Sequence, residues 1–221
     1  MGQRFTLPFG INGFTLKWIA MITMMIDHMG LMLFPQYPIF RIIGRLAFPI
    51  YCFLLVEGAV HTSDIKKYLL RLLTFALVSE IPFNLVCAGE VWNLGYQNVF
   101  FTLALGLAAI AVFESVRLKS YGIVAAIIAI LAAEVIHADY GGAGVVFILI
   151  FYLFRERIWQ KILFFLVADI WLYGGIQNYA IFSLIPIICY NGKRGPGMKY
   201  MFYFMYPIHL LLLYGLKRWI G

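Results

Sequence analysis

Long apolar runs, separated only by short polar breaks, dominate this sequence. The first run covers residues 16–34, and about 20 apolar residues are enough for a helix to cross a bilayer. Charged residues make up 12% of the chain and hydrophobic residues 63%, so too few charges remain to cover a surface that faces water. These proportions exclude an ordinary soluble globular protein. The runs do not alternate between apolar and polar residues, which favours helices over the strands of a membrane barrel.

Proline, glycine and clusters of charge divide the chain into nine expected helices. Their approximate ranges are 16–34, 44–60, 66–86, 98–116, 121–137, 142–155, 159–174, 178–191 and 199–217. Each range is apolar on all sides, which is typical of membrane helices rather than of amphipathic surface helices. The expected fold class is therefore all-α, a polytopic membrane bundle of about nine transmembrane helices. We expect residues 1–221 to form a single transmembrane domain.

The positive charges are distributed unevenly between the two ends of the expected helices. The chain has 17 Lys and Arg against 10 Asp and Glu, a net charge of +7. Thirteen of these 17 cations fall on one side, namely Arg4, Lys17, Lys66, Lys67, Arg71, Arg117, Lys119, Arg155, Arg157, Lys161, Lys193, Arg194 and Lys199. Cytoplasmic loops are enriched in Lys and Arg. We therefore place this side and the N-terminus in the cytoplasm, and attribute the net charge to topology rather than to nucleic-acid binding.

Several ionisable residues lie inside the apolar runs, where they are costly to bury and indicate function. At 1.5 Å per residue, His28 lies about 16 Å from Lys17, and His209 about 15 Å from Lys199. The two histidines are therefore expected at similar depth on different helices. Neighbouring residues on a helix diverge by about 100°, so Asp27 and His28 must each find a partner on another helix.

Other polar residues lie toward the outer ends of the expected helices. Glu80 and Asn84 are four residues apart and share a helix face, and Asn98 begins the next helix. We predict one polar cavity, open to the outside, that is lined by His28, Glu80, Asn98 and His209.

A second polar cluster follows the second expected helix on the cytoplasmic side. It contains Glu57, His61, Lys66, Lys67 and Arg71. Its cations are suited to binding the phosphates of a cytoplasmic ligand, and they also satisfy the positive-inside rule without any ligand. The chain contains no motif for zinc, for a nucleotide-binding loop or for a serine hydrolase, and we expect no bound metal.

Nine short blocks of residues, spread in order along most of the chain, carry a resemblance to a known family. They are 16–20 (LKWIA), 25–28 (MIDH), 41–49 (RIIGRLAFP), 56–58 (VEG), 61–62 (HT), 68–72 (YLLRL), 79–84 (SEIPFN), 97–102 (QNVFFT) and 206–210 (YPIHL). Together these blocks resemble the TraX family, named for the F-pilin acetylase of conjugation systems. The resemblance covers about residues 16–216.

The resemblance implies a multi-pass acetyltransferase of the bacterial cytoplasmic membrane. Its acyl donor would be cytoplasmic acetyl-CoA, and its acceptor the N-terminal amine of a pilin or other exported protein, with another amine or a sugar hydroxyl still open. Acetyl transfer needs a base for the attacking group and a hydrogen-bond donor for the developing oxyanion. We expect His28 to be the base.

The remaining roles have several candidates. Asp27, Glu80 or Asp169 would orient an imidazole or bind the acceptor amine, and Arg45, Asn98 or His209 would donate to the oxyanion. The CoA phosphates would be held by Lys66, Lys67 and Arg71, with His61 and Glu57 beside them. Lys17 is a further candidate for phosphate binding.

Two functions from other classes also fit the sequence. The first is a small proton-coupled transporter that uses Asp27, His28 and Glu80, because ionisable residues near the membrane centre suit it equally well. The second is an assembly scaffold without catalysis. Neither requires CoA, so CoA binding by the purified protein separates both from the acetyltransferase.

Reporter fusions along the chain test the predicted topology. We expect fusions after residues 66, 117, 160 and 192 to report the cytoplasm, and fusions after residues 92 and 139 to report the outside. The cation asymmetry is the reason for this expectation. A cytoplasmic signal from the fusion after Trp92 would contradict the map.

Overall fold

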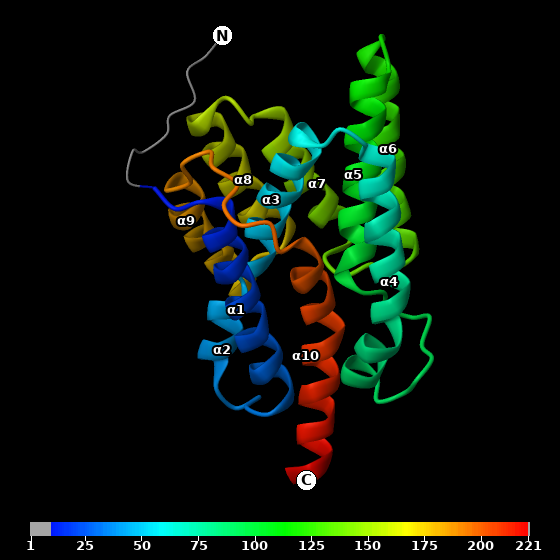
Figure 1. The fold of residues 1–221 in the computed structure, drawn as a ribbon, viewed down its shortest axis with the longest axis vertical. Coiled ribbons are helices and arrows are strands. Elements are labelled where there is room, and N and C mark those ends of the chain that lie inside the picture. The colour runs from blue at the N-terminus through cyan, green and yellow to red at the C-terminus, as the bar shows by residue number, and fades with distance from the viewer. Residues whose placement is uncertain (1–9, 221) are drawn as a thin grey trace. The chain divides into compact units, whose positions relative to one another are not determined.

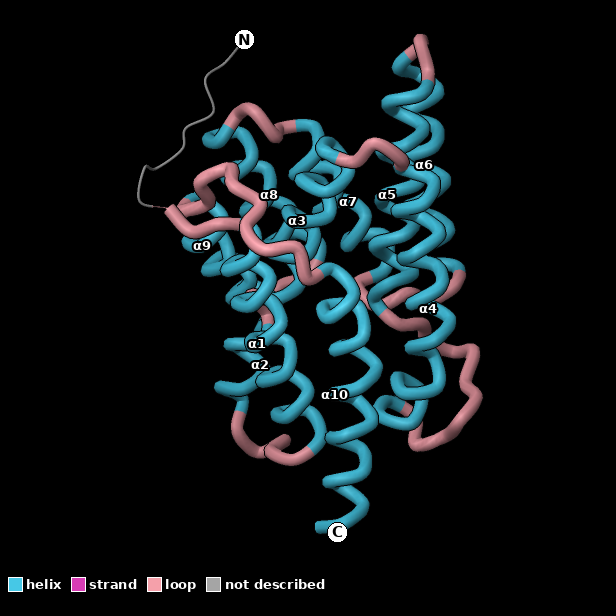
Figure 2. The backbone as a smooth tube through the Cα atoms, in the orientation of Figure 1, coloured by secondary structure: helices cyan, strands magenta, loops and turns pink. Residues whose placement is uncertain are grey.

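The computed structural model describes residues 10–220, and its regular structure within that range is helical (Figures 1 and 2). The helices are α1 Gly13–Met32, α2 Pro38–Gly44, α3 Ala47–His61, α4 Ile65–Cys87, α5 Val99–Ser115, α6 Lys119–Val135, α7 Gly141–Leu153, α8 Ile158–Leu172, the 3-10 helix η1 Gly175–Ser183, α9 Leu184–Ile188 and α10 Lys199–Ile220. Two isolated β-bridges, Ile11 with Tyr190 and Gln97 with Ala138, accompany them. The predicted all-α class is confirmed.

Every expected range contains a helix, but two of the ranges are interrupted. Residues 38–44 form a separate short helix, α2, that was not predicted. Pro49 explains the break before α3, because proline lacks an N–H and is tolerated only in the first turn of a helix. The range 178–191 was wrongly predicted as one helix: η1 is followed by α9, whose first turn contains Pro186.

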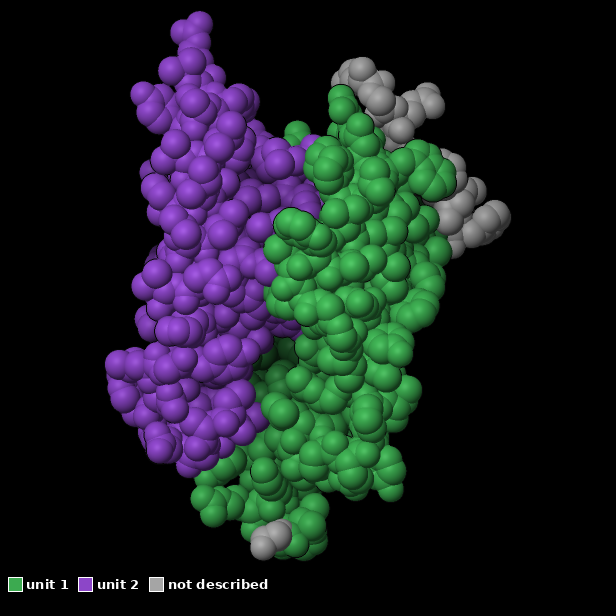
Figure 3. All heavy atoms as spheres, turned by 180° about the vertical axis from the view of Figure 1, so that it is seen from behind, with its two compact units in different colours: residues 1–54, 154–221 green, residues 55–153 purple. Residues whose placement is uncertain are grey.

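The chain forms two compact units, which Figure 3 shows in different colours. Unit 1 comprises residues 1–54 and 154–221, and unit 2 comprises residues 55–153. Each unit is described by itself, and the single transmembrane domain stays a prediction. Arg4, one of the predicted cytoplasmic cations, lies outside the described residues.

Unit 1 is organised around α1, which packs against α2 and α10, while η1 packs against α2, α8 and α9. Asn12 caps α1 by accepting a hydrogen bond from the backbone N–H of Thr15. The loop before α10 runs beside this cap, where the N–H of Gly13 donates to the carbonyl of Lys193 at 2.8 Å (Figure 2). The cap therefore fixes the start of α1 against a loop that carries cations.

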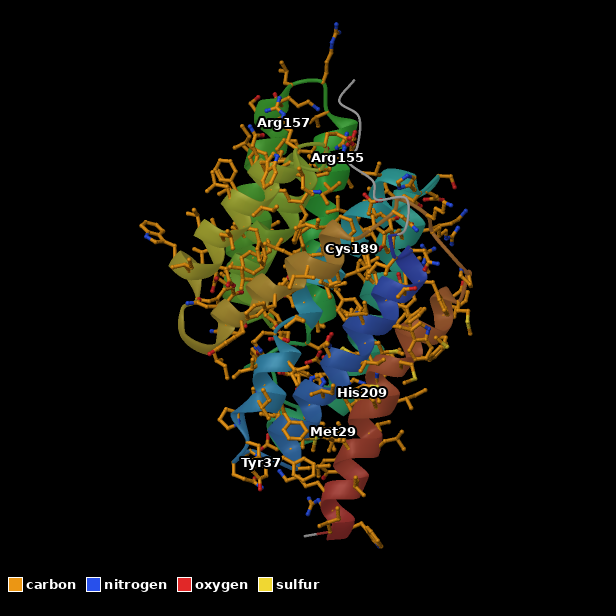
Figure 4. The ribbon with its side chains drawn as sticks, turned by 90° about the vertical axis from the view of Figure 1, so that its left-hand side faces the viewer. Met29, Tyr37, Arg155, Arg157, Cys189 and His209 are labelled. Carbon is orange, nitrogen blue, oxygen red and sulfur yellow. The ribbon has the colours of Figure 1, made fainter. Side chains whose placement is uncertain are left out.

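Two of the predicted cytoplasmic cations lie together at one end of unit 1. Figure 4 shows Arg155 and Arg157 at one end of the unit, and Met29 and Tyr37 toward the opposite end. This is the arrangement that the loop charges predict for these residues.

Unit 2 consists of α4, α5, α6 and α7, with the last turns of α3. Helices α5, α6 and α7 contact one another pairwise, and α4 contacts α5. Glycines allow these close approaches: a Cβ on Gly106 would lie 2.4 Å from Ile148, and one on Gly122 would lie 2.6 Å from Phe113. Small residues at helix contacts are typical of membrane bundles.

Two helical stretches are long and apolar enough to cross a membrane. They are Pro38–His61, which combines α2 and α3, and Ile65–Cys87, which is α4. The apolar stretches Val99–Ser115, Gly141–Leu153 and Gly175–Ile188 are shorter. Nine spans and their orientation therefore stay predictions.

The packing of α1 on α2 can be tested at Gly30. A Cβ there would lie 2.4 Å from the Cβ of Phe40, which is attached to the backbone and cannot move away cheaply. We expect Gly30→Ala to destabilise the protein by about 1–3 kcal/mol through overpacking, measured as a lower thermal unfolding temperature in detergent.

Gly215 of α10 provides the matched control. Nothing lies within 4 Å of a Cβ added at this position. We expect Gly215→Ala to stabilise the helix by about 0.5–1 kcal/mol. Equal effects of the two substitutions would contradict the tight contact at Gly30.

Candidate functional site

Two histidines from different helices touch in unit 1. Nδ1 of His28 on α1 lies 2.8 Å from Nε2 of His209 on α10, and the ring centroids are 4.9 Å apart. His209 is 2% exposed, and the ring of Tyr206 meets both imidazoles edge to face. Figure 4 shows His209 on the Met29 side of Cys189, away from Arg155. The sequence predicted this similar depth from helical rise alone.

The hydrogen bonds of this pair determine where its protons lie. The carbonyl of Met205 can only accept, so Nδ1 of His209, 2.8 Å away, carries a hydrogen. In a neutral imidazole the other nitrogen is then bare, so Nε2 of His209 accepts the hydrogen on Nδ1 of His28. Nε2 of His28 is then the nitrogen that keeps the lone pair. The pair therefore presents one free base.

Asp27, the neighbour of His28 in sequence, binds two arginines. Its Oδ2 accepts from Nη1 of Arg41 at 2.5 Å, and its Oδ1 accepts from Nη2 of Arg45 at 2.6 Å. Nη1 of Arg41 also lies 3.4 Å from the backbone carbonyl of Asp27. Both oxygens of Asp27 face guanidinium groups, and its expected role in orienting an imidazole or binding the acceptor amine stays a prediction.

The local fold of α2 creates this ion-pair network. Arg41 and Arg45 are four residues apart and so share one face of the helix and its C-cap. Gly44 between them allows close contact, because a Cβ there would lie 2.1 Å from Oδ1 of Asp27. Two cations against one carboxylate leave a net positive charge beside the histidines.

Arg45 extends the network to a third element. Its Nη1 donates to Oε1 of Gln177 on η1 at 3.0 Å, and its Nε donates to the carbonyl of Arg41 at 3.2 Å. Arg45 is thus held on three sides within the protein. This leaves Arg45 poorly placed to serve as the oxyanion donor that the sequence suggested.

His209 was a second candidate for that donor, and the structure argues against it. Its Nδ1 hydrogen points to Met205 and its Nε2 accepts from His28, so no donor remains. Arg41 is better placed, since its Nε and Nη2 make no hydrogen bond within residues 10–220 and its side chain is 32% exposed. The sequence offered one signal for Arg41, its spacing of four residues from Arg45.

Glu80 and Asn98 pair with each other in unit 2. Nδ2 of Asn98 donates to Oε2 of Glu80 at 2.5 Å and to the carbonyl of Ala76 at 2.8 Å. Oδ1 of Asn98 caps α5 by accepting from the N–H of Phe100. Both amide hydrogens are therefore engaged within unit 2, and donation from Asn98 to an oxyanion stays a prediction. A cavity shared with the histidines stays a prediction.

The residues proposed to bind phosphates surround the turn between α3 and α4. Nδ1 of His61 lies 2.8 Å from the carbonyl of Glu57, and the Arg71 guanidinium lies 5.4 Å from the ring centre of Tyr68. Lys66 is exposed. These residues belong to unit 2, whereas Lys17, whose ammonium lies 5.7 Å from the ring centre of Phe202, belongs to unit 1.

Lys67, the remaining member of this group, is engaged by Asp64 at the start of α4. Oδ1 of Asp64 accepts from the N–H of Lys67 at 2.9 Å, and Oδ2 lies 3.1 Å from its ammonium. Hydrogen bonds from the backbone N–H and then the ammonium of Lys67 lower the pKa of Asp64. Lys66 and Arg71 are therefore better placed than Lys67 to receive a phosphate.

A protein family and one curated protein match this chain over most of its length. A family model described as TraX protein matches residues 12–217. A probable fimbrial assembly protein FimC, serogroup H1, from Dichelobacter nodosus is 33% identical over 238 residues, covering 95% of this chain and 97% of that protein. An uncharacterized protein, RP591, from Rickettsia prowazekii (strain Madrid E) is 58% identical over 38 residues, 17% of this chain and 15% of that protein. No solved structure matches the chain.

Proposed function

The chain belongs to the TraX family, and on that premise we propose that it is an integral membrane acetyltransferase. It moves an acetyl group from cytoplasmic acetyl-CoA to an acceptor outside the cytoplasm, the N-terminal amine of a pilin or another exported protein. Membership in a family associated with pilin acetylation supports this proposal, as does similarity to a probable fimbrial assembly protein. The proposed location is the bacterial cytoplasmic membrane, crossed several times.

The observation that carries the proposal is the contact between His28 and His209, which leaves the lone pair of His28 on Nε2. This nitrogen takes a proton from the attacking amine while the amine nitrogen bonds to the carbonyl carbon of the thioester. The carbon–sulfur bond then breaks, and the CoA thiolate receives the proton from His28. The products are an acetylated amine and free CoA, and His28 returns to its neutral form.

The neighbours of His28 stabilise the charges that develop in this reaction. When His28 is protonated, its Nδ1–H still donates to Nε2 of His209, which orients the ring and shares the positive charge. The oxyanion receives hydrogen bonds from the free edge of Arg41, which Asp27 holds in place. Preorganised donors of this kind are often the largest single contribution to catalysis.

Substitution of the two histidines separates their roles. We expect His28→Ala to lower acetyl transfer by about 10²–10⁴-fold, the usual contribution of a general base, while CoA binding stays unchanged. His209→Ala removes only the ring that orients the base, so its loss should be smaller. Transfer to a peptide amine by purified protein gives both values.

His137, an exposed residue in the turn before α7, is the matched control. His137→Ala should retain the activity of the unsubstituted protein. Full activity of His28→Ala would show that His28 is not the base of the reaction.

The phosphates of acetyl-CoA are proposed to bind at Lys66 and Arg71. Each charge-assisted hydrogen bond contributes about 1.5–3 kcal/mol, so the double variant Lys66→Gln with Arg71→Gln should weaken CoA binding about a hundredfold or more. Calorimetry in detergent measures this affinity. Lys217→Gln with Arg218→Gln removes the same charge from the end of α10 and should leave the affinity unchanged. If both double variants bound CoA with equal affinity, Lys66 and Arg71 would not bind its phosphates, and their charges would serve only to orient the chain in the membrane.

A further inference from the structure

The loop between α9 and α10 is tied to the residues that precede α1. The N–H of Ile11 donates to the carbonyl of Cys189 at 2.8 Å, and the N–H of Asn191 donates to the carbonyl of Ile11 at 2.9 Å. The side-chain amide of Asn191 also donates to the carbonyl of Gly10 at 2.7 Å. These bonds hold the loop in one place beside the start of α1, as Figure 1 shows.

This anchoring brings cations of the loop onto one face of α1. The N–H of Gly13 donates to the carbonyl of Lys193 at 2.8 Å, and a Cβ added at Gly13 would lie 3.1 Å from the carbonyl oxygen of Arg194. Lys17 lies four residues after Gly13 and so on the same face, one turn along α1. The charge of Arg194 is close enough to repel the Lys17 ammonium. We call Lys17, Lys193 and Arg194 the basic face of unit 1.

Three aromatic rings adjoin the basic face. Phe14, Trp18 and Phe202 meet edge to face, with ring centroids 5.8–6.2 Å apart. The Lys17 ammonium lies 5.7 Å from the ring centre of Phe202, and all three rings are partly exposed. Tryptophan is enriched at the level of the lipid headgroups, so these rings indicate that the basic face lies at the membrane interface.

The basic face has no carboxylate partner within the described protein. The acidic residues of unit 1 are Asp27, Glu156 and Asp169. Asp27 is bound by two arginines, Glu156 lies 3.7 Å from another arginine, and Asp169 is buried in α8. Among residues 10–220, no ion pair joins a carboxylate to the basic face. Like charges at short range repel, so an anion from outside the protein would be stabilised there.

Orientation in the membrane does not by itself explain this arrangement. The positive-inside rule counts cations near the ends of the spans and sets no requirement on the distances between them. A site for one phosphate does set such a requirement, because several donors must reach the same group of oxygens. The loop meets this requirement, since it holds Lys193 and Arg194 against the helix that carries Lys17.

We propose that the basic face binds the phosphate of an anionic phospholipid. The ammonium of Lys17 and the guanidinium of Arg194 donate hydrogen bonds to the phosphate oxygens, and the three aromatic rings pack against the glycerol part of the lipid. Basic pockets between membrane helices on the cytoplasmic side are suited to such headgroups, and the cation asymmetry predicts that side for this face. The site does not depend on acetyl transfer.

Native mass spectrometry of the full-length protein tests this site with two lipids. Dioleoyl phosphatidylglycerol is anionic, and dioleoyl phosphatidylcholine has the same acyl chains without a net charge. Two cations near an anionic membrane surface strengthen binding about thirtyfold. We expect the unsubstituted protein to retain the anionic lipid preferentially. The double variant Lys17→Gln with Arg194→Gln should lower its affinity for that lipid by about the same factor.

Arg155→Gln with Arg157→Gln is the matched control. It removes the same charge from the same predicted side of unit 1. Arg155 already lies 3.7 Å from the carboxylate of Glu156, so this pair is not a site that waits for an anion. We expect the control to retain the preference for the anionic lipid.

Thermal unfolding in detergent distinguishes a lipid site from a structural contact. Because Arg194 has no ion pair within residues 10–220, Arg194→Gln should leave the unfolding temperature of the lipid-free protein unchanged or raise it. Added phosphatidylglycerol should raise this temperature for the unsubstituted protein, because a ligand that binds the folded state stabilises it. The double variant at Lys17 and Arg194 should lack that rise.

Four results would overturn the proposal. They are equal retention of both lipids by the unsubstituted protein, an equal loss of the anionic lipid in both double variants, and a clear fall in the lipid-free unfolding temperature of Arg194→Gln. The fourth is a loss of CoA or inorganic phosphate binding in the variant at Lys17 and Arg194 while its lipid retention is intact. That result would assign the basic face to a soluble phosphate ligand.

Discussion

The ion pairs between one carboxylate and two guanidinium groups organise unit 1. Removing charges from water is unfavourable, and a pair compensates for this only when its geometry is good and the remaining donors are satisfied. Asp27 and Arg45 meet this condition, because Arg45 also binds Gln177 and a backbone carbonyl, whereas Arg41 binds Asp27 through Nη1 alone. The network therefore joins α1, α2 and η1 at one level of the unit. Hydrophobic packing is not directional, so it would not by itself fix the positions of α1, α2 and η1 along one another.

The histidine pair depends on that arrangement. His28 follows Asp27 on α1, so fixing the Asp27 side chain also fixes the rotation of α1 about its axis. With that rotation set, His28 faces α10 and meets His209. The positive charge that remains on the arginines lies close to His28, the proposed base, where it would attract a developing negative charge. Structural support and chemistry thus come from the same few residues.

Much of the fold was predictable, because the apolar runs and their breaks mark the helices. The depth of His28 and His209 was also predictable, since helical rise is constant. The roles of polar side chains were less so. The Asn98 side chain has an amide group that can donate hydrogen bonds, yet in the structure this amide caps α5 and binds Glu80. Gln177 gave no signal at all, because its partner, Arg45, is 132 residues away.

The interrupted helices show a second limit of sequence reasoning. Hydropathy does not distinguish a 3-10 helix from an α-helix, so residues 178–191 were predicted as one helix where η1 and α9 occur. Only the proline in the first turn of α9 hints at the change. The consequence matters for the site, since a 3-10 helix places every third residue on the same face and so aligns Gln177 with Ala180 and Ser183 against the unit.

Gly44 shows that this site depends on the absence of a side chain. The closest approach between α2 and Asp27 occurs where a side chain is missing, and one methyl group would occupy the position of a carboxylate oxygen. Surveys that truncate side chains to alanine measure what is lost when atoms are removed. Here the informative change is the addition of atoms. A position that carries no functional group can thus constrain the ion-pair geometry as strictly as the charged residues around it.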